Sequence, residues 1–514
     1  MIRFARIFMA VALALGAAST AQAQQSCITV SKVDLIGVAL FTPAEQASWV
    51  APFEGRCIGL GEINQILEAV TLSYVDAGFV TARAYLPEQN LADGSLEIRV
   101  VEGELSAITF NGEARPAWQA AVFPGMIGRP LNLREVEQGL EQIRALPSYS
   151  AEMDIGAGAA QGQSVLAVSA TSARPWTGSI SVNNNGAVQT GEHIFALDLG
   201  ADNLMGLNDR WTLNLGQSWG EDPAGTANGS FALHVPRGKW DFTTKASWSS
   251  YQQDTPGTFG PIPVDGWTQS FAFTATRLLQ RNQETKTHLD IALTRRANEN
   301  RIAHVRIESS SRIMATLGLT LRHQRPLWGG QLNASLGWAQ GLAAFGAEDF
   351  AAQPVGSPNA QFGLATFSLS LTRPWQLEAG ALTYTGTIRG QWSDDRLYGT
   401  QQMSLGGSSS VHGSKSGLIS GNRGVLWRNE LSYSFANAPA ALGRVSLYLG
   451  ADIGRIAPQS AYGISGGTVA GAVIGLRASG GWADVDLSYQ QIADASAGIP
   501  IPDGVFLFSI SRKF

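Results

Sequence analysis

The chain has 514 residues, with 58 glycines, 14 tryptophans, 15% charged residues and a formal net charge of -5. The acidic balance argues against nucleic acid as a partner. After Ala23 there is no run of about 18 uncharged apolar residues, which excludes a bundle of membrane-spanning helices. Little charge with many glycines and tryptophans is typical of a transmembrane β-barrel, in which lipid-facing and lumen-facing residues alternate.

The first residues are predicted to be a secretory signal. Two arginines precede an apolar run from Ile7 to Ala18, and Ala21-Gln22-Ala23 fits the small-x-small pattern of cleavage before Gln24. The run is shorter than the roughly 20 residues that a spanning helix needs, so a membrane anchor is the weaker interpretation. We therefore expect residues 1–23 to be removed and the mature chain to leave the cytoplasm.

Residues 24–103 are predicted to form a small α+β domain. A strand is expected from Ile28 to Ile36, and Thr42-Pro43-Ala44-Glu45 then forms a capping box with proline at the first helical position. The remaining predicted elements are a second helix with one apolar face, which ends near Gly78, and strands at 80–86 and 96–101.

The same order of elements recurs in residues 104–174. A strand at 105–110 leads to a short helix around Trp118, and Asn132 caps a longer helix. The inward face of that helix is predicted to carry Leu133, Val136, Leu140 and Ile143, and strands follow near 151–155 and 165–169. Two small β-α-α-β-β domains in tandem fit this order, each near the lower size limit for a self-supporting core.

Cys27 and Cys57 are the two cysteines of the chain. An exported chain meets an oxidising compartment, where two cysteines either pair or remain free, and we expect a disulfide. Closing a loop of about 30 residues would stabilise the small domain by roughly 3 kcal/mol in the chain-entropy model.

From residue 175 to residue 514 the helical period disappears and a period of two replaces it. In the segment 211–216, for example, Trp and Leu alternate with Thr, Asn and Gly. Alternation and turn residues together predict sixteen strands. Alternation alone also fits a soluble sandwich, because one face of such a sheet is polar.

The lengths of the gaps between these strands distinguish a transmembrane barrel from a soluble sandwich. Short and long gaps alternate in a fixed phase, as the periplasmic turns and extracellular loops of outer-membrane barrels do. The short turns are predicted at 236–239, 280–283, 325–329, 373–378 and 479–481. The long loops are predicted at 254–266, 297–310, 342–360, 394–423, 455–467 and 493–503.

In the last predicted strand, the alternating positions are Phe506, Phe508, Ile510, Arg512 and Phe514. A terminal phenylalanine after alternating aromatic residues resembles the signal by which outer-membrane barrels are delivered to the barrel-assembly machinery. An edge strand of a soluble sheet is the alternative. The predicted fold is an all-β transmembrane barrel of 16 antiparallel strands, preceded by two α+β domains.

Several motifs resemble those of one family. The run Tyr74 to Pro87, followed by Gly94-Ser95-Leu96 and Val100-Val101-Glu102-Gly103, looks like the signature of that family's first periplasmic domain. Asn183-Asn184-Asn185-Gly186 and the run Asp202 to Asp209 are similar to the opening of its barrel. These motifs resemble the two-partner secretion transporters, the hemolysin secretion and activation protein family of the BamA-like superfamily, whose periplasmic domains are called POTRA domains.

The resemblance implies a transporter in the cell outer membrane, with its two POTRA domains in the periplasm. Its partner would be a large secreted exoprotein of the hemolysin or adhesin type, whose N-terminal secretion domain docks on the POTRA domains. We expect a monomer surrounded by outer-membrane lipid, with no cofactor. Two alternatives stay open: an outer-membrane protein assembly insertase of the same superfamily, and a diffusion porin, which leaves the periplasmic part without a task.

The longest loop, 394–423, holds the motif Val411-His412-Gly413. Family members usually read Val-Arg-Gly there, and the arginine pairs with an aspartate of a barrel strand, which Asp452-Ile453-Gly454 matches here. The resemblance therefore implies a loop-to-barrel anchor of Val411, His412, Gly413 and Asp452. Histidine cannot make the bidentate fork of a guanidinium, so either a weaker His412 to Asp452 hydrogen bond persists or glycine turns and packing alone fix the loop.

A second departure from the family concerns the start of the mature chain. Many relatives carry an N-terminal helix that plugs the barrel, and the residues between Ala23 and Ile28 leave no room for one. Gating of the lumen is then expected to depend on the long loop.

Catalysis and metal binding are not expected. Gly463-Ile464-Ser465-Gly466-Gly467 matches the spelling of a hydrolase elbow but lacks its strand-to-helix context. Gly407 to Lys415 is only a near miss for a phosphate loop, with the wrong spacing. The six histidines are scattered without the spacing of metal ligands.

Overall fold

The computed structural model describes residues 27–219, 224–349, 351, 357–407 and 409–514. The predicted secretory signal, residues 1–23, lies outside these residues. The described chain forms two compact units, one that reaches Glu104 and includes Ala160–Gln163, and one that holds Leu105–Ala159 and Ser164–Phe514. Among the described helices none has the length and apolar character needed to cross a membrane.

The first unit packs two helices on short strands. Its elements are β1 (Ile28–Val30), β2 (Lys32–Ile36), α1 (Pro43–Val50), β3 (Arg56–Ile58), α2 (Leu60–Asp76), β4 (Arg83–Tyr85) and β5 (Ser95–Val101). One sheet has the order β2-β5-β4, with β2 parallel to β5, and β1 pairs with β3 separately. Ile66 and Tyr74 of α2 are fully buried with Leu96 of β5 in the core of the unit. The predicted capping box is present at the start of α1.

Two predicted strands of this unit are wrong in extent. The segment 28–36 is two strands, because Ser31 donates from its backbone N and from Oγ to the Gly94 carbonyl, at 2.8 and 3.0 Å. At this residue the chain leaves its partner β3 and joins β5. The segment 80–86 contributes only the three residues of β4.

The second unit begins with another small α+β repeat. Its elements are β6 (Glu104–Phe110), α3 (Pro116–Val122), α4 (Leu133–Arg144), β7 (Tyr149–Ala157) and β8 (Gln163–Ser172), and the sheet order is β6-β8-β7. Phe110 stacks on Trp118 with ring centroids 4.8 Å apart. Val136, Leu140 and Ile143 of α4 are buried as predicted, whereas Leu133 is only half-buried.

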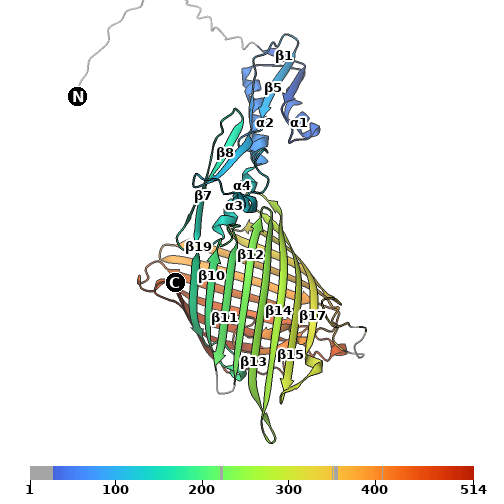
Figure 1. Ribbon diagram of the computed structural model, residues 1–514, viewed down its shortest axis with the longest axis vertical. Coiled ribbons are helices and arrows are strands. Elements are labelled where there is room, and N and C mark those ends of the chain that lie inside the picture. Colours follow the sequence, from blue (N-terminus) through green and yellow to red (C-terminus); the bar gives the residue numbers. More distant parts are fainter. Residues whose placement is uncertain (1–26, 220–223, 350, 352–356, 408) are drawn as a thin grey trace, which may run out of the picture. The chain divides into compact units, whose positions relative to one another are not determined.

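The remainder of the second unit is a closed antiparallel barrel of sixteen long strands, as predicted (Figure 1). The first strand pairs with the last, which closes the cylinder. The strands are β9 (Trp176–Asn183), β10 (His193–Asp202), β11 (Arg210–Trp219), β12 (Gly225–Arg237), β13 (Trp240–Gly257), β14 (Gly260–Arg281), β15 (Lys286–Ile302), β17 (Arg312–Leu327), β18 (Gly330–Leu342), β19 (Gly363–Leu377), β20 (Gly380–Trp392), β23 (Gly424–Phe435), β24 (Gly443–Ile456), β25 (Gly467–Gly480), β26 (Asp484–Ala495) and β27 (Val505–Lys513). The two-residue strand β16 (Val305–Arg306) pairs with the end of β15.

Exposed and buried side chains alternate along a barrel strand, and this alternation distinguishes the outer wall of the barrel from the lumen. On β24, Leu447, Leu449 and Ile453 are exposed, while Tyr448 and Asp452 between them are buried. Exposed apolar side chains on a barrel wall face lipid, so Tyr448 and Asp452 face the lumen. On the other strands, too, the exposed apolar side chains lie on the outer face and the residues between them face the lumen.

Some predicted loop positions are wrong. The segment 254–266 is not a long loop, because β13 and β14 stay paired up to Gly257 and Gly260, and their hairpin extends beyond the barrel rim (Figure 1). Its prolines are tolerated because β14 does not pair with β15 before Val264, so a missing N–H can face solvent at a free edge. The turn predicted at 373–378 lies at 378–379, and β15 continues to Ile302 in the segment predicted to begin a loop at 297.

Candidate functional site

The loop between β20 and β23 folds into the barrel instead of projecting from it. Within the loop, β21 (Met403–Gly406) pairs antiparallel with β22 (Gly417–Gly421). Leu405 and Val411 of this loop are fully buried in a cluster with side chains from β23, β24, β25 and β26, namely Leu426, Ile456, Val469 and Ile492. The loop therefore packs on the lumen wall through apolar contacts.

Glycines bring the tip of the loop against the strand backbones. Gly413 has a φ of +112°, and a Cβ there would collide with the main chain of Gln491 and Ile492 on β26. On the other side, a Cβ at Gly471 of β25 would collide with the carbonyl oxygen of His412. Glycine is needed at both positions, because any larger residue would push the tip off the wall.

His412 contacts the buried carboxylate of Asp452 twice. Its backbone N donates to Asp452 Oδ2 at 3.0 Å, and its ring Nδ1 is hydrogen-bonded to the same oxygen. The Asp452 side chain is 0% exposed and the His412 side chain 11% exposed. Of the four residues predicted as the loop-to-barrel anchor, the structure brings all of them together at this point of the lumen wall.

A third side chain completes the contact. Arg428 of β23 places Nη2 2.7 Å from His412 Nε2, and its Nε lies 3.7 Å from Asp452 Oδ2. A guanidinium only donates hydrogen bonds, so Nε2 must accept and the ring proton must sit on Nδ1, facing Asp452. The permanent positive charge opposite Asp452 comes from Arg428.

Asp452 is only partly satisfied by these contacts. In the described part of the chain its second oxygen, Oδ1, has no hydrogen-bond partner. A buried carboxylate needs both a counter-charge and filled hydrogen-bonding positions to offset its desolvation, so one acceptor remains open at this site.

Two further polar contacts hold the loop. Arg389 of β20 donates from Nη2 to the backbone oxygen of Ser409 at 2.6 Å. Lys415 lies 3.0 Å from the carboxylate of Glu192, which is in the loop between β9 and β10. Sequence reasoning missed Arg428, Arg389 and Lys415 as contacts of the loop, although the period of two places Arg428 on the lumen face of its strand.

The other predicted site residues lie elsewhere. Cys27, which directly precedes β1, and Cys57 of β3 are bonded as a disulfide, with Cα atoms 5.3 Å apart. Phe514 exchanges backbone hydrogen bonds with Gly178 of β9 at 2.9 and 3.1 Å, and its side chain is 62% exposed. It lies at the seam where the first and last strands close the barrel.

The second α+β repeat is fastened to the short turns of the barrel. Arg281, at the end of β14, donates to Gln138 at 2.9 Å and pairs with Glu141 at 2.5 Å, both on α4. Lys286, at the start of β15, lies 2.5 Å from the same Glu141. Burial acts to raise the pKa of Glu141, but hydrogen bonds from Lys286 and Arg281 outweigh it and hold that pKa below its usual value.

Neutral contacts extend this interface to other turns. Trp118 Nε1 donates to Asn208 Oδ1 at 2.9 Å, and Asn208 Nδ2 donates to the Gln142 carbonyl at 2.8 Å. Ser148 donates from N and Oγ to Asp202 at 2.9 and 2.6 Å. In the same repeat, β7 is an edge strand, since the sheet order leaves one of its sides without a partner strand among the described residues.

The described residues contain no group of three or more His, Cys, Asp or Glu side chains placed to hold a metal ion. Ser465, the serine of the hydrolase-like motif, lies in the loop before β25, where no helix follows it. The charged lumen residues Asp452, Arg428 and Arg389 contact the loop and hold it against the wall.

Comparisons with known proteins agree with this architecture. The family described as haemolysin secretion/activation protein ShlB/FhaC/HecB matches residues 162–478, more than half of the chain. A POTRA domain of the ShlB type matches residues 28–103, and a further POTRA domain matches residues 104–157.

Individual relatives match most of the chain. It is 34% identical over 465 residues to the outer membrane transporter CdiB of Escherichia coli, covering 90% of this chain and 78% of that protein. It is 30% identical over 484 residues to the hemolysin transporter protein ShlB of Serratia marcescens, covering 91% and 85%. The solved structure of CdiB from Escherichia coli matches with a TM-score of 0.90 at 31% identity, covering 97% of this chain and 93% of that one.

Proposed function

The chain belongs to the haemolysin secretion/activation protein family ShlB/FhaC/HecB, and from this membership we propose how it works as an outer-membrane transporter of two-partner secretion. It exports a large exoprotein from the periplasm to the cell surface. The exoprotein arrives unfolded, docks by its N-terminal secretion domain on the two POTRA domains, and crosses the barrel lumen. Sixteen strands leave an aqueous lumen wide enough for an extended chain, provided that the inward-folded loop moves.

The observation that carries this proposal is the loop of residues 393–423 held inside a closed barrel. Its tip is held by Asp452, Arg389 and Glu192, and all three contacts are polar and can be exchanged for water. We assign Val411, His412, Gly413 and Asp452 the role of an anchor that keeps the resting lumen closed. A transporter of this kind needs no catalytic residue, and none is assigned.

The docking step is assigned to the periplasmic repeats. The edge strand β7 is nine residues long and offers unpaired backbone groups to which an extended segment can add as a further strand. Backbone hydrogen bonds would supply affinity there, and side-chain contacts would supply specificity for the exoprotein. The domain limits that go with this division of labour are 24–103 and 104–174 for docking and 175–514 for translocation.

The working form is assigned as a monomer surrounded by outer-membrane lipid. Phe514 is assigned as the signal for the barrel-assembly machinery, because its exposed ring stays accessible at the seam even after closure. A Phe514→Ser chain should then reach the outer membrane in clearly smaller amount than the wild type on immunoblots of membrane fractions. Equal amounts would remove this role.

Capture and conductance together test the proposed function against its two alternatives. The full chain in detergent, and a barrel of residues 175–514 as control, would be offered an unfolded secretion domain of an exoprotein. Capture by the full chain alone, with gated conductance in planar bilayers, supports export. Capture of unfolded barrel precursors instead would favour an insertase, and steady conductance without capture would favour a porin.

A further inference from the structure

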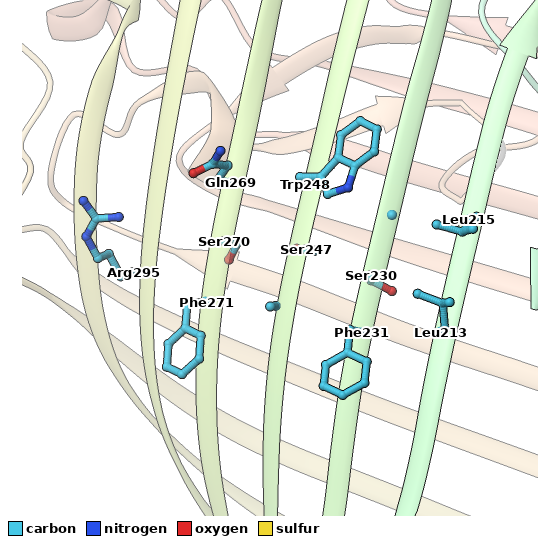
Figure 2. A pocket seen from close by; sticks show the side chains of 12 residues that line it. Leu213, Leu215, Ser230, Phe231, Ser247, Trp248, Gln269, Ser270, Phe271 and Arg295 are labelled. Atoms are coloured by element: carbon cyan, nitrogen blue, oxygen red, sulfur yellow. The ribbon is translucent and has the colours of Figure 1, made fainter. Parts of the chain in front are cut away.

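An apolar groove runs over the outer wall of the barrel, across β11, β12, β13 and β14 (Figure 2). Its volume is about 430 Å³. The large side chains that line it are Leu213, Leu215, Phe231, Trp248 and Phe271, which are between 36% and 53% exposed. All five face outward, so the groove opens toward lipid.

Small residues create the groove. Gly229 lies opposite Trp248 in the register of β12 and β13, and Ala246 lies opposite Phe231. A Cβ added at Gly229 would come within 2.9 Å of Trp248 Nε1 and 3.3 Å of Leu215 Cδ2. A large side chain at this position would therefore fill the groove.

One margin of the groove is polar. Arg295 lies opposite Phe271 in the register of β14 and β15, and Figure 2 shows it beside that ring. Its Nε donates to the backbone oxygen of Phe345 at 3.0 Å, which fixes the guanidinium and leaves both terminal nitrogens for another ligand. Among the described residues, no carboxylate pairs with Arg295 and no acceptor receives the indole N–H of Trp248.

The polar margin lies near the outer leaflet. On the outward face of β14, Ala275, Phe273 and Phe271 form an apolar stretch. Two polar side chains, Arg277 and Gln269, lie at its ends. Eight residues of a strand that rises about 3.3 Å per residue and tilts by about 40° span roughly 20 Å of the membrane. Arg277 is close to the short periplasmic turns, so Gln269 and Arg295 lie at the far, extracellular boundary of the apolar band.

We propose that this groove binds one phosphate-bearing lipid of the outer leaflet. An acyl chain lies over Phe231 and Trp248, and the lipid phosphate is held by the free nitrogens of Arg295. The charges are complementary, because an unpaired guanidinium at headgroup depth meets the anionic group that outer-leaflet lipids carry there. The apolar floor gives the acyl chain a fixed position that a flat wall would not give.

Native mass spectrometry of the full chain in detergent tests this proposal, with lipid A as the phosphate-bearing probe. Arg295→Ala and Gly229→Leu should each weaken lipid A binding by about tenfold, the first by removing the cation and the second by filling the groove. Arg277→Ala is the matched control, since it removes an outward arginine at the other boundary. Heat-modifiable migration on gels checks that every variant contains a folded barrel.

Three results would overturn the proposal. One is lipid A binding by Arg295→Ala or by Gly229→Leu at the wild-type level. Another is an equal loss of binding in Arg277→Ala, which would mean that any outward cation suffices. The third is binding of diacylglycerol, which has acyl chains but no phosphate, as strongly as lipid A. Diacylglycerol that binds about tenfold more weakly supports the phosphate contact.

Discussion

Asp452 receives its polar contacts from two different elements. The loop supplies an imidazole and a backbone N–H through His412, and β23 supplies the permanent positive charge through Arg428. The family's usual arginine would bring donor and charge together from the loop. In this chain the charge opposite Asp452 stays on the wall when the loop leaves, so the buried carboxylate keeps its counter-charge during opening.

Removal of the imidazole should loosen the loop without unfolding the barrel. In His412→Ala the backbone N–H still reaches Asp452, but the ring's hydrogen bonds to Asp452 and Arg428 are lost, each to a charged group and each worth about 1.5–3 kcal/mol. The released state should become roughly tenfold or more frequent, seen as more frequent openings in single-channel recordings. His412→Arg should open no more often than the wild type, because a guanidinium can also use the vacant Oδ1. His304→Ala, in an exposed loop, is the control, and openings of His412→Ala at the wild-type rate would contradict the anchor.

Loss of the wall charge should cost more than loss of the imidazole. Arg428→Gln leaves Asp452 as a buried carboxylate without a counter-charge, a change that typically destabilises by about 3–5 kcal/mol. The barrel should lose its compact gel mobility at lower temperature than the wild type. The double variant Arg428→Gln/His412→Arg returns a guanidinium from the loop side and should recover most of the loss. A double variant as unstable as the single one would show that Arg428 acts through another contact.

At the scale of elements, the sequence predicted correctly those helices whose limits are set by neighbouring residues. The capping box at Thr42 and the apolar face of α2 specify their helices within a few residues. The hairpin of β13 and β14 was missed because its prolines and glycines are typical of a loop. Their tolerance depends on the free edges beyond the rim, a property of the assembled sheet.

The contact of α4 with the barrel should depend on pH through Glu141. Since the pKa of Glu141 is lowered in the folded chain, its stabilisation is complete above the ordinary value of 4.5 and is lost as pH falls through the folded value. Protease cleavage in the segments that flank α4 should accelerate as pH falls below that value in the wild type. Glu141→Gln should be cleaved faster at pH 7 and show less dependence on pH.

The control for this pH effect is Glu152→Gln, an exposed substitution on β7 of the same repeat. It should keep the wild-type rate and the wild-type pH dependence. If Glu141→Gln behaves in the same way as this control, the ion pairs with Arg281 and Lys286 do not hold α4 in place.

At the scale of the whole molecule, the alternating gaps predicted correctly a closed barrel and the long loop that follows β20. What the sequence could not reveal is how that loop lies, because Glu192, the partner of Lys415, comes from a loop 223 residues away in the chain. The junction of α4 with the barrel turns has the same origin, since Gln138 and Arg281 are 143 residues apart. Such contacts follow from closure of the cylinder, which brings distant segments to one rim.

A covalent link between the loop and the wall tests whether export requires the loop to move. Lys415 and Glu192 form an ion pair at 3.0 Å, so cysteines at both positions can be joined by a short bismaleimide. The native Cys27 and Cys57 are bonded to each other and do not react. The linked transporter should secrete little or none of its exoprotein, because a pinned loop leaves no free path through the lumen, whereas each single-cysteine variant treated with the same reagent should secrete normally. Secretion by the linked form at the wild-type rate would mean that the exoprotein passes beside a stationary loop.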